Sequence, residues 1–448
     1  MRTGKIRFRR GIDRRYRLGA LLNVSVTVVS GIHRVPGDKS ITHRALMLAA
    51  LARGRSEIRG ALTSDDARSS ARVLRLLGAE ISALRAGIRI DVTAHGRLRV
   101  ADRSLDCGNS GTTARLLLGM LAAHRFVSTL SGDRSLQKRP MRRVTDPLTA
   151  MGARVVRIRH DGLPLTIAGG RLHTLQWRLP VASAQIKSAL LLAGAVAGVD
   201  VTLEQPAASR DHTERMLRYF GFDVRETALK VALRPGGRFV PFGIDVPGDP
   251  SSAIFLLAAA ALASRGEIAV EGVSLNPSRI GFIAVMRRMN IPVASHDVGD
   301  EAGEPIGTLV AGASEIVATD IAAAEVPGVI DEIPMLACLA ARARGTSRFA
   351  GLAELRVKES DRLALIASNL RAVGVDATVD GDDLIVEGTD VPPAGRAVTR
   401  GDHRIAMAFA VLGTLPGARI RIDDRTCAAV SFPGFDATLA GLFQRTAR

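Results

Sequence analysis

The sequence has little cysteine, few aromatic residues and no long apolar run, and each shortage excludes a class of protein. Its three cysteines, Cys107, Cys338 and Cys427, are far apart and form no CxxC pair, so we expect neither a disulfide scaffold nor a zinc module. Such cysteines suit a reducing compartment, and we expect a cytoplasmic protein. No run of 18 apolar residues occurs, so no transmembrane helix is expected. No residue cluster predicts a metal or an organic cofactor.

Lysine is also scarce, with 6 Lys against 55 Arg, although the formal net charge is +17. A field of that sign attracts nucleic acids, anionic membranes or small polyanions. One Trp, two Tyr and 4% aromatic residues provide few platforms for stacking bases, and an arginine excess is also typical of a G+C-rich genome. We therefore expect small anionic molecules as partners, and neither nucleic acid nor membrane.

The remaining lysines are informative for that reason. If arginine is used wherever either cation serves, a surviving lysine indicates a site that needs a compact ammonium group. For any single lysine, the alternative is that it has survived by chance. The six are Lys5, Lys39, Lys138, Lys187, Lys230 and Lys358.

What the sequence does contain is enough apolar residue for real cores. Of 448 residues, 47% are hydrophobic and 23% charged, which predicts a globular chain of two or three domains. Residues 1–17 are strongly basic and precede an alternating stretch at 22–29. A basic segment before an apolar one resembles a secretory signal, but the two-residue period indicates a strand. We interpret residues 1–17 as a disordered leader, with a targeting signal as the alternative.

The chain repeats one supersecondary unit, marked by a hairpin that starts at a glycine or a similar turn residue. The five hairpins begin at Gly78, Gly152, Gly221, Asn290 and Gly374, at intervals of 69 to 84 residues. Each unit also holds a helix that is apolar nearly all round, which indicates burial. The six helices are expected at residues 40–52, 111–123, 183–197, 251–263, 331–343 and 402–415. Because hairpins number one fewer than helices, we expect the strand at 22–29 to complete the sixth unit.

These repeats predict an α/β fold of two lobes, each of three repeated units. The chain would cross between lobes at Pro36-Gly37 and Pro247-Gly248, which gives lobe 1 residues 36–246 and lobe 2 residues 18–35 plus 247–448. The first turn of a buried helix leaves backbone N–H groups unpaired and carries the positive end of the dipole. If several such termini meet in one cleft, that cleft should bind more than one negative group.

The segment PGDKSITHR at 36–44 is the first candidate site. It places Lys39 and Ser40 at the start of a buried helix, with Arg44 one turn further on the same face. These groups suit a phosphate or a carboxylate, although Gly-Asp-Lys-Ser also makes an ordinary N-cap. The segment is not a GxxxxGK[ST] nucleotide loop, because the glycines of that loop are missing.

Eight segments, in order, resemble the signature series of the 5-enolpyruvylshikimate-3-phosphate synthase family of enolpyruvyl transferases. They are PGDKSITHRA (36–45), GNSGTTARL (108–116), KRPM (138–141), SAQIKSALLLAG (183–194), SRDHTE (209–214), GDPSSAIF (248–255), LRVKESDRL (355–363) and DHRIAMA (402–408). The family fold is an inside-out α/β barrel of two three-unit lobes with two crossovers, in agreement with the repeats. The resemblance implies transfer of the enolpyruvyl group of phosphoenolpyruvate to the 5-hydroxyl of shikimate 3-phosphate, by addition and then elimination of phosphate, in aromatic amino-acid biosynthesis.

The resemblance also implies the site residues. Phosphoshikimate would be bound by Lys39, Ser40, Arg44, Ser183, Gln185, Ser209, Arg210, Asp331 and Lys358, and phosphoenolpyruvate by Lys39, Asn109, Gly111, Thr112, Arg139, Gln185, Arg362 and Arg404. Asp331 would act as base for the hydroxyl, and Lys39 and Glu359 as proton-transfer groups. For any one arginine the alternative is a solvated surface charge, and for Asp331-Glu332 it is a helix cap.

Some features of this chain depart from the family pattern. Part of the family has a lysine in the segment at 427–433, where this chain has Val430, and a branch has a second serine where Ala184 stands and a tyrosine near His212. Cys427 is either a reactive thiol near the cleft or, as we favour, a small buried one.

Three other functions stay open as alternatives. The first is enolpyruvyl transfer to UDP-N-acetylglucosamine, against which the pairs Lys39-Ser40 and Ser183 with Gln185 favour phosphoshikimate. The second is a basic nucleic-acid-binding or RNA-end-processing protein on a related repeat fold, and the third is a non-catalytic relative. We expect a monomer whose lobes close on its small-molecule substrates.

Overall fold

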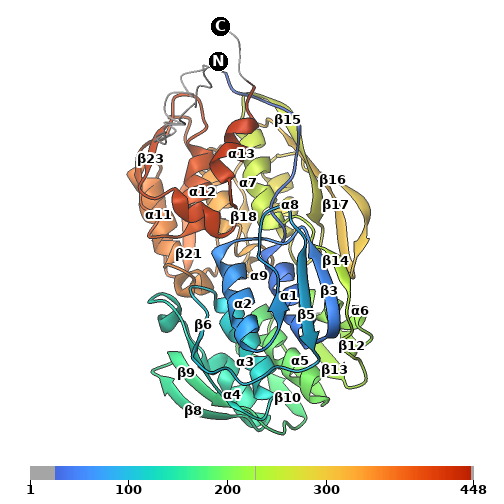
Figure 1. The fold of residues 1–448 in the computed structure, drawn as a ribbon. Coiled ribbons are helices and arrows are strands. Elements are labelled where there is room, and N and C mark those ends of the chain that lie inside the picture. The colour runs from blue at the N-terminus through green and yellow to red at the C-terminus, as the bar shows by residue number, and fades with distance from the viewer. Residues whose placement is uncertain (1–25, 228, 445–448) are drawn as a thin grey trace, which may run out of the picture.

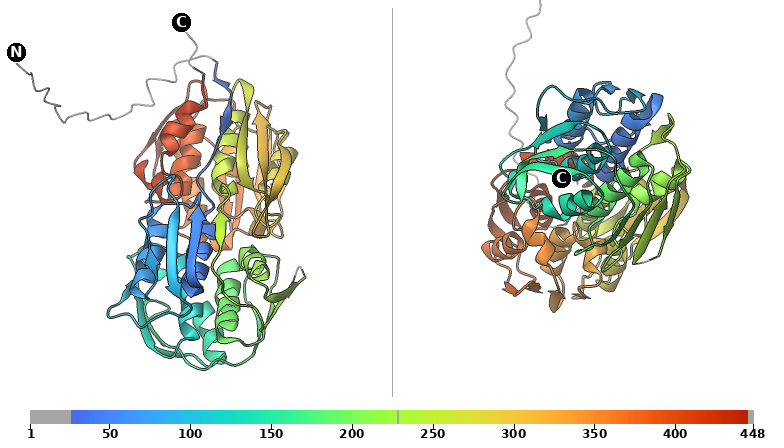
Figure 2. Two further views of the ribbon diagram at one scale, coloured as in Figure 1. Left: turned by 45° about the vertical axis from the view of Figure 1, so that its right-hand side comes forward. Right: turned by 90° about the horizontal axis from the view of Figure 1, so that it is seen from below.

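The computed structural model of the chain describes residues 26–227 and 229–444, so the predicted leader lies outside the described residues. The described residues form two lobes stacked end to end (Figure 1; Figure 2, left). Each lobe has its own apolar core. We call lobe 1 the part whose core runs from Ile41 to Val246, which Ala302 also joins, and lobe 2 the part whose core otherwise runs from Ala253 to Leu442 and includes Val29. The lobe boundaries predicted from the sequence stay a prediction.

The repeated unit is a small sheet with a constant strand order, in which a parallel pair is extended by an antiparallel hairpin. Lobe 1 holds three such sheets: β14 (Gly243–Asp245), β3 (Arg53–Arg59), β5 (Ile90–His95) and β4 (Glu80–Ile81); β6 (Leu105–Asp106), β7 (Val127–Ser131), β9 (Gly162–Ala168) and β8 (Arg154–Arg159); β10 (Leu175–Arg178), β11 (Val201–Glu204), β13 (Lys230–Arg234) and β12 (Asp223–Glu226). The last strand of the lobe, β14, thus pairs with β3 of the first unit and closes the lobe.

Lobe 2 repeats the pattern, with a reduced final sheet. Its sheets are β1 (Val28–Val29), β15 (Arg265–Ser274), β17 (Glu304–Gly312) and β16 (Ala294–Glu301), with β2 (Ile32–His33) also on β15; β18 (Asp320–Ile321), β19 (Thr346–Phe349), β21 (Asp383–Glu387) and β20 (Ala377–Asp380); and β22 (Ala394–Ala397) with β23 (Arg419–Ile422). The described part of the predicted N-terminal strand pairs with β15, where Val28 faces Arg265. It therefore joins the sheet of the fourth unit and not, as we had expected, that of the sixth. Its other edge bonds to the segment that ends the sixth unit, where Val29 bridges Phe443 and the N–H of Ser30 donates to the carbonyl of Leu442 at 3.2 Å.

Each hairpin is preceded by an amphipathic helix on the outside of the lobe. These helices are α2 (Asp65–Leu76), α4 (Arg142–Ala150), α6 (His212–Tyr219), α8 (Gly281–Arg288) and α11 (Arg362–Ala372). The residue that opens each predicted hairpin has a positive φ, from +62° at Asn290 to +115° at Gly152. Glycine adopts this conformation without steric cost and asparagine tolerates it, which explains the recurring residue types at these positions.

Six nearly all-buried helices form the centres of the lobes. They are α1 (Lys39–Leu51), α3 (Gly111–Ala122) and α5 (Ala184–Ala197) in lobe 1, and α7 (Pro250–Ala261), α10 (Ile333–Ala340) and α12 (His403–Leu412) in lobe 2. Helices α3 and α5 pack so closely that a Cβ at Gly119 would lie 1.9 Å from the carbonyl oxygen of Ala189. Two shorter helices, α9 (Val326–Val329) and α13 (Phe435–Gly441), complete the set. In the described chain, no helix combines the length and apolarity needed to cross a membrane.

The two crossovers between the lobes lie side by side. Gly37 and Gly248 form an antiparallel bridge. The backbone N–H of Asp38 donates to the carbonyl of Pro247 at 2.7 Å, and the N–H of Asp249 donates to the carbonyl of Pro36 at 2.9 Å. The predicted crossover points are thus joined directly, so the starts of α1 and α7 have a fixed separation.

Candidate active site

A cavity of about 450 Å³ lies between the two lobes, and its wall is built from the entrances of all six buried helices. Lys39, Thr112 and Gln185 line it from α1, α3 and α5 of lobe 1. From lobe 2, Asp249 caps α7, Asp331 precedes α10 and Arg404 lies in the first turn of α12, and all three line the same cavity. Because each helix start is the positive end of a dipole, the cavity favours negatively charged ligands.

Most of the site residues predicted from the sequence meet in this cavity. Twelve of them line it: Lys39, Ser40, Thr112, Arg139, Ser183, Gln185, Ser209, Arg210, Asp331, Lys358, Glu359 and Arg404. The other four, Arg44, Asn109, Gly111 and Arg362, are not part of the lining. The convergence is a consequence of the fold, since each of these segments stands at the same end of its repeat.

The charged groups around the cavity are predominantly cationic. Its lining includes eight cations, Lys39, Arg115, Arg139, Arg143, Arg210, Arg279, Lys358 and Arg404, and four carboxylates, Asp249, Asp331, Glu354 and Glu359. Guanidinium groups bind carboxylates and phosphates with two parallel hydrogen bonds. Within the described residues, no group of three or more His, Cys, Asp or Glu is arranged to hold a metal ion. The cavity therefore suits small molecules that carry several negative charges.

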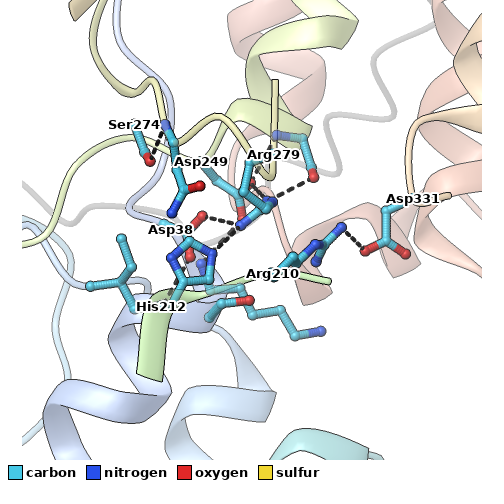
Figure 3. A network of polar contacts seen from close by, with 12 residues as sticks. Asp38, Arg210, His212, Asp249, Ser274, Arg279 and Asp331 are labelled. Carbon is cyan, nitrogen blue, oxygen red and sulfur yellow. Dashed lines mark hydrogen bonds and ion pairs between the residues drawn. The ribbon is translucent and has the colours of Figure 1, made fainter. Parts of the chain in front are cut away.

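Asp331 lies at the centre of the cationic groups. Its carboxylate is 2.5 Å from an amino nitrogen of Arg210 in lobe 1, across the cavity (Figure 3), and 3.7 Å from Nζ of Lys358. Burial alone would raise the pKa of Asp331, but the charges of Arg404, Arg210 and Lys358 outweigh it and hold that pKa well below the ordinary value. Asp331 is therefore ionised at neutral pH and can accept a hydrogen bond from a hydroxyl.

Glu359 is a second ionised carboxylate in the wall. Its Oε2 atom lies 2.6 Å from an amino nitrogen of Arg362. Burial opposes ionisation, but Arg362 and then Arg139 hold the pKa of Glu359 well below its ordinary value. Arg362 is itself almost fully buried and also donates from Nε to Asp402 at 2.8 Å. It therefore orients Glu359 from behind the wall.

Lys39 enters the cavity from the start of α1. Its ammonium group pairs with the carboxylate of Asp66, and its backbone N–H donates to Asp249 Oδ2 at 3.1 Å. Asp66 lies in the first turn of α2 and was not among the predicted site residues, although it fixes the direction of the Lys39 side chain. A second anion that displaced Asp66 would meet an ammonium group already aimed at it.

Arg139 and Gln185 belong to a polar network at the start of α3. Arg139 donates to Asn109 Oδ1 at 2.6 Å, and Gln185 donates to the hydroxyl of Thr112 at 2.9 Å. A Cβ at Gly111 would approach the guanidinium of Arg139 to 3.2 Å. Gly111 and Asn109 therefore act on the wall indirectly: one leaves room for Arg139 and the other holds it.

Arg44 lies deeper than the resemblance implies. Its Nε atom donates to Thr213 at 2.7 Å and one amino group donates to Ser188 at 2.7 Å, while the other binds the carbonyl of Ser40 at 3.0 Å. Arg44 thus joins α1, α5 and α6 and supports the turn that carries Ser40. Direct contact between Arg44 and a substrate stays a prediction.

Sequence reasoning missed several charged residues of the wall. They are Asp249, Arg115, Arg143, Arg279 and Glu354. Two of them carried a signal: Arg115 stands in the GNSGTTARL segment and donates to Gln185 at 2.6 Å, and Asp249 stands in a second Pro-Gly-Asp sequence that repeats the one before Lys39. Arg143 and Glu354 pair across the lobes at 3.3 Å, which no local pattern could have predicted.

The C-terminal segment that departs from the family pattern stays outside the cavity wall. Val430 ends a short 3-10 helix at Thr426–Val430, and neither Val430 nor Cys427 lines the cavity. Cys427 is half-buried, and burial raises the pKa of its thiol to about 12. A thiol with such a pKa is a poor nucleophile. Cys427 is therefore unreactive, as we favoured, but it is only half-buried and not, as we expected, fully buried.

Known proteins resemble this chain along nearly its whole length. A model of the family described as EPSP synthase (3-phosphoshikimate 1-carboxyvinyltransferase) matches residues 25–439. A 3-phosphoshikimate 1-carboxyvinyltransferase of Rhodospirillum rubrum is 46% identical over 431 residues, which cover 93% of this chain and 95% of the relative. The one of Acidiphilium cryptum is 45% identical, with the same shares covered.

Solved structures agree with this assignment. EPSP synthase from Acinetobacter baumannii superposes with a TM-score of 0.83 at 37% identity, covering 94% of this chain and 97% of that one. The enolpyruvyl transferase NikO from Streptomyces tendae has a TM-score of 0.74 at 20% identity, covers 94% of this chain and 96% of its own, and is similar in fold alone. On the family match and the identity to its relatives, the chain belongs to the EPSP synthase (3-phosphoshikimate 1-carboxyvinyltransferase) family.

Proposed function

We propose that this chain transfers the enolpyruvyl group of phosphoenolpyruvate to the 5-hydroxyl of shikimate 3-phosphate and releases phosphate. The observation that carries the proposal is the interlobe cavity, where two ionised carboxylates, Asp331 and Glu359, stand among eight cations. Each substrate carries a phosphate and a carboxylate, which accounts for the excess of positive charge. The names of the relatives supply the identity of the acceptor.

The acceptor is proposed to occupy the part of the cavity bounded by Ser40, Ser183, Ser209 and Arg210 on lobe 1. Hydroxyl groups and a guanidinium suit a phosphate and the ring hydroxyls of a shikimate. Arg210 contacts Asp331 of lobe 2 at 2.5 Å, so an acceptor held by Arg210 lies within reach of that carboxylate. Asp331 is the proposed base for the 5-hydroxyl, and Lys358 is the cation beside it.

The donor is proposed to lie between the starts of α3 and α12. Arg139, Thr112 and Gln185 line this region from lobe 1, and Arg404 lines it from lobe 2. Arginines on opposite walls can hold the phosphate and the carboxylate of one molecule, and they stabilise the charge that develops on the departing phosphate. Closure of the lobes on the two anions would also exclude water.

The proton transfers follow from the charges of the wall. In the addition step the hydroxyl oxygen bonds to C2 of phosphoenolpyruvate, its proton goes to Asp331, and C3 receives a proton from Lys39 or Glu359. In the elimination step C3 gives a proton back to Lys39 or Glu359, the bond from C2 to the phosphate oxygen breaks, and inorganic phosphate leaves. Glu359 starts ionised, so it must take up a proton before it can donate one. A bound anion would promote this by neutralising Arg139, which lines the cavity and helps to keep Glu359 ionised.

The acceptor can be tested directly by measuring phosphate release from phosphoenolpyruvate. We expect phosphate release with shikimate 3-phosphate to be at least ~10³ times faster than with UDP-N-acetylglucosamine. The wrong acceptor would leave polar groups of the proposed acceptor site without hydrogen-bond partners. A reaction without acceptor gives the background hydrolysis. Equal rates with both acceptors, or release without any acceptor, would contradict the proposed function.

The alkaline limb of the pH profile tests the role of Lys358. Burial lowers the pKa of Lys358 below its ordinary value of 10.5, although Asp331 opposes the shift. The ammonium therefore loses its charge at a lower pH than a free lysine does. We expect kcat/KM to fall as this charge is lost. Lys358→Arg should move this limb to higher pH, because a guanidinium stays charged. Lys138→Arg, at an exposed position, is the matched control. If the alkaline limb is the same in the parent, Lys358→Arg and Lys138→Arg, Lys358 is not the group that titrates.

We also propose that the enzyme acts as a cytoplasmic monomer without a cofactor. The starts of all six buried helices already wall the cavity, so the proposed site needs no residue from a second copy. The three cysteines are free thiols. A single species at the monomer mass in sedimentation or scattering, with full activity at that concentration, is the expected result.

A further inference from the structure

One buried arginine lies between the two crossovers, and the proposed reaction gives it no role. Arg279 stands between β15 and α8, is 1% exposed and lines the floor of the cavity. One amino group is 2.6 Å from Asp38 Oδ2 and the other is 2.7 Å from Asp249 Oδ1 (Figure 3). Its remaining contacts are with Ser251 Oγ at 2.9 Å and His212 Nε2 at 3.2 Å. A single side chain therefore bridges both lobes.

The two carboxylates that Arg279 binds are the N-caps of equivalent helices. Asp38 Oδ1 accepts the N–H of Ile41 at 2.8 Å at the start of α1, and Asp249 Oδ1 accepts the N–H of Ser251 at 2.8 Å at the start of α7. The sequences that precede them, PGDKS at 36–40 and PGDPS at 247–251, repeat the same motif in the two lobes. The repeat places two caps side by side, and one cation serves both.

The charge of these caps matters because of where they lie. Asp38 is fully buried and Asp249 is 5% exposed, and Asp249 also accepts the backbone N–H of Lys39. Two buried carboxylates beneath a cavity for anions would repel the ligands and carry a large desolvation cost unless a cation compensates them. An arginine can bind two carboxylates at once through its planar fork, whereas a lysine ammonium is a single point charge.

We propose that Arg279 is a positioning residue that compensates the two cap carboxylates and so keeps the cavity floor, with Lys39 above it, suited to anions. Its contact with Ser251 extends this effect, because the Ser251 hydroxyl donates to buried Glu332, the neighbour of Asp331. The KM measurement in this test rests on the proposed function, whereas the measurement of phosphate binding does not. The inference about Arg279 and the proposed function can therefore fail separately.

The test compares Arg279→Gln with a variant in which the caps are also neutralised, Asp38→Asn and Asp249→Asn. Asparagine is as good an N-cap as aspartate, so the triple variant keeps the helix starts and removes the uncompensated charge. For the single variant we expect the Kd of inorganic phosphate, measured by calorimetry, and the KM of phosphoenolpyruvate to rise at least about tenfold, as one unpaired charge at close range requires. The triple variant should recover most of both losses.

Two further variants keep this test decisive if Arg279→Gln unfolds. Arg279→Lys retains the charge and should give an intermediate Kd, and Arg287→Gln on α8 is the matched exposed control, whose Kd should be that of the parent. The inference is overturned if phosphate binding by Arg279→Gln or Arg279→Lys equals that of the parent, or if the triple variant recovers its melting temperature but not its Kd. A parent protein that binds phosphate yet fails to turn over shikimate 3-phosphate would overturn the proposed function alone.

Discussion

Glu359→Gln is expected to lower kcat by about 10²–10⁴-fold, the range lost when a general acid–base group is removed, while KM changes little. Glutamine has the shape of glutamate but neither accepts nor supplies a proton at neutral pH. The substitution leaves Arg362 in place, because Asp402 still binds its Nε at 2.8 Å. Binding of the donor should therefore survive, and the loss should lie in the chemical step. Steady-state phosphate release, together with a single-turnover experiment, separates these two quantities.

Hydrogen exchange distinguishes Glu359 from Lys39 as the group that serves the methylene carbon. In D₂O the parent enzyme should exchange the C3 hydrogens of phosphoenolpyruvate during turnover, and Glu359→Gln should lose this exchange together with kcat. Glu315→Gln is the matched control, because Glu315 is exposed and pairs only with Arg344 among the described residues. If Glu359→Gln retains exchange and loses less than tenfold in kcat, the proton transfers belong to Lys39.

Glu359 and Asp331 also illustrate how far the sequence could predict the site. Both stand in segments that match the family series, so their presence in one cavity could be expected. The sequence could not predict that one arginine connects them. Arg362 contacts Asp331 at 3.3 Å and Glu359 at 2.6 Å. The resemblance places Arg362 on phosphoenolpyruvate; the structure buries it outside the cavity lining, so its direct contact with the substrate stays a prediction. A guanidinium with three carboxylate partners is compensated there without a ligand, which a motif does not reveal.

The sequence predicts those elements of the fold that depend on the local pattern of residues. It does not predict which strands pair, because pairing depends on the tertiary structure. The predicted helix at 40–52 is α1, Lys39–Leu51, because all-round apolarity depends only on the segment itself. For the N-terminal strand, alternation predicts which face is buried but not which strand lies beside it. Its described part lies between β15 of the fourth unit and the segment at Phe443 that ends the sixth. Arg279 gave no signal either, since one arginine among 55 resembles surface charge until the fold places it between two caps.

Lys187 is the surviving lysine whose burial makes it most informative. It lies on α5, is 1% exposed, and its Nζ is 2.7 Å from the fully buried Glu214 on α6. The same ammonium donates to the carbonyl of Ser209 at 3.1 Å, which holds the loop of the proposed acceptor site. The single ammonium thus serves two acceptors from α5, the Glu214 carboxylate and the Ser209 carbonyl, as suits a compact cation with three donors.

Lys187→Met is expected to lower the free energy of unfolding by about 3–5 kcal/mol, the cost of leaving one partner of a buried pair alone. Burial already raises the pKa of Glu214 above its ordinary value of 4.5, and the variant loses the ammonium that opposes this rise. A raised folded pKa means that stability is retained below the unfolded pKa and lost as pH rises through the folded one, so the defect should be smallest in acid. Urea denaturation at acid and neutral pH measures it.

A second substitution in the same pair separates its effect on stability from its effect on the site. Lys187→Met with Glu214→Leu replaces the buried pair by apolar groups and should recover most of the stability. The KM for shikimate 3-phosphate should be raised in Lys187→Met and equally raised in this double variant, because the Ser209 carbonyl has lost its donor in both. Lys230→Met, at an exposed position on β13, should leave both quantities unchanged. Recovery of KM together with stability would show that Lys187 acts on the fold alone and not on the loop at Ser209.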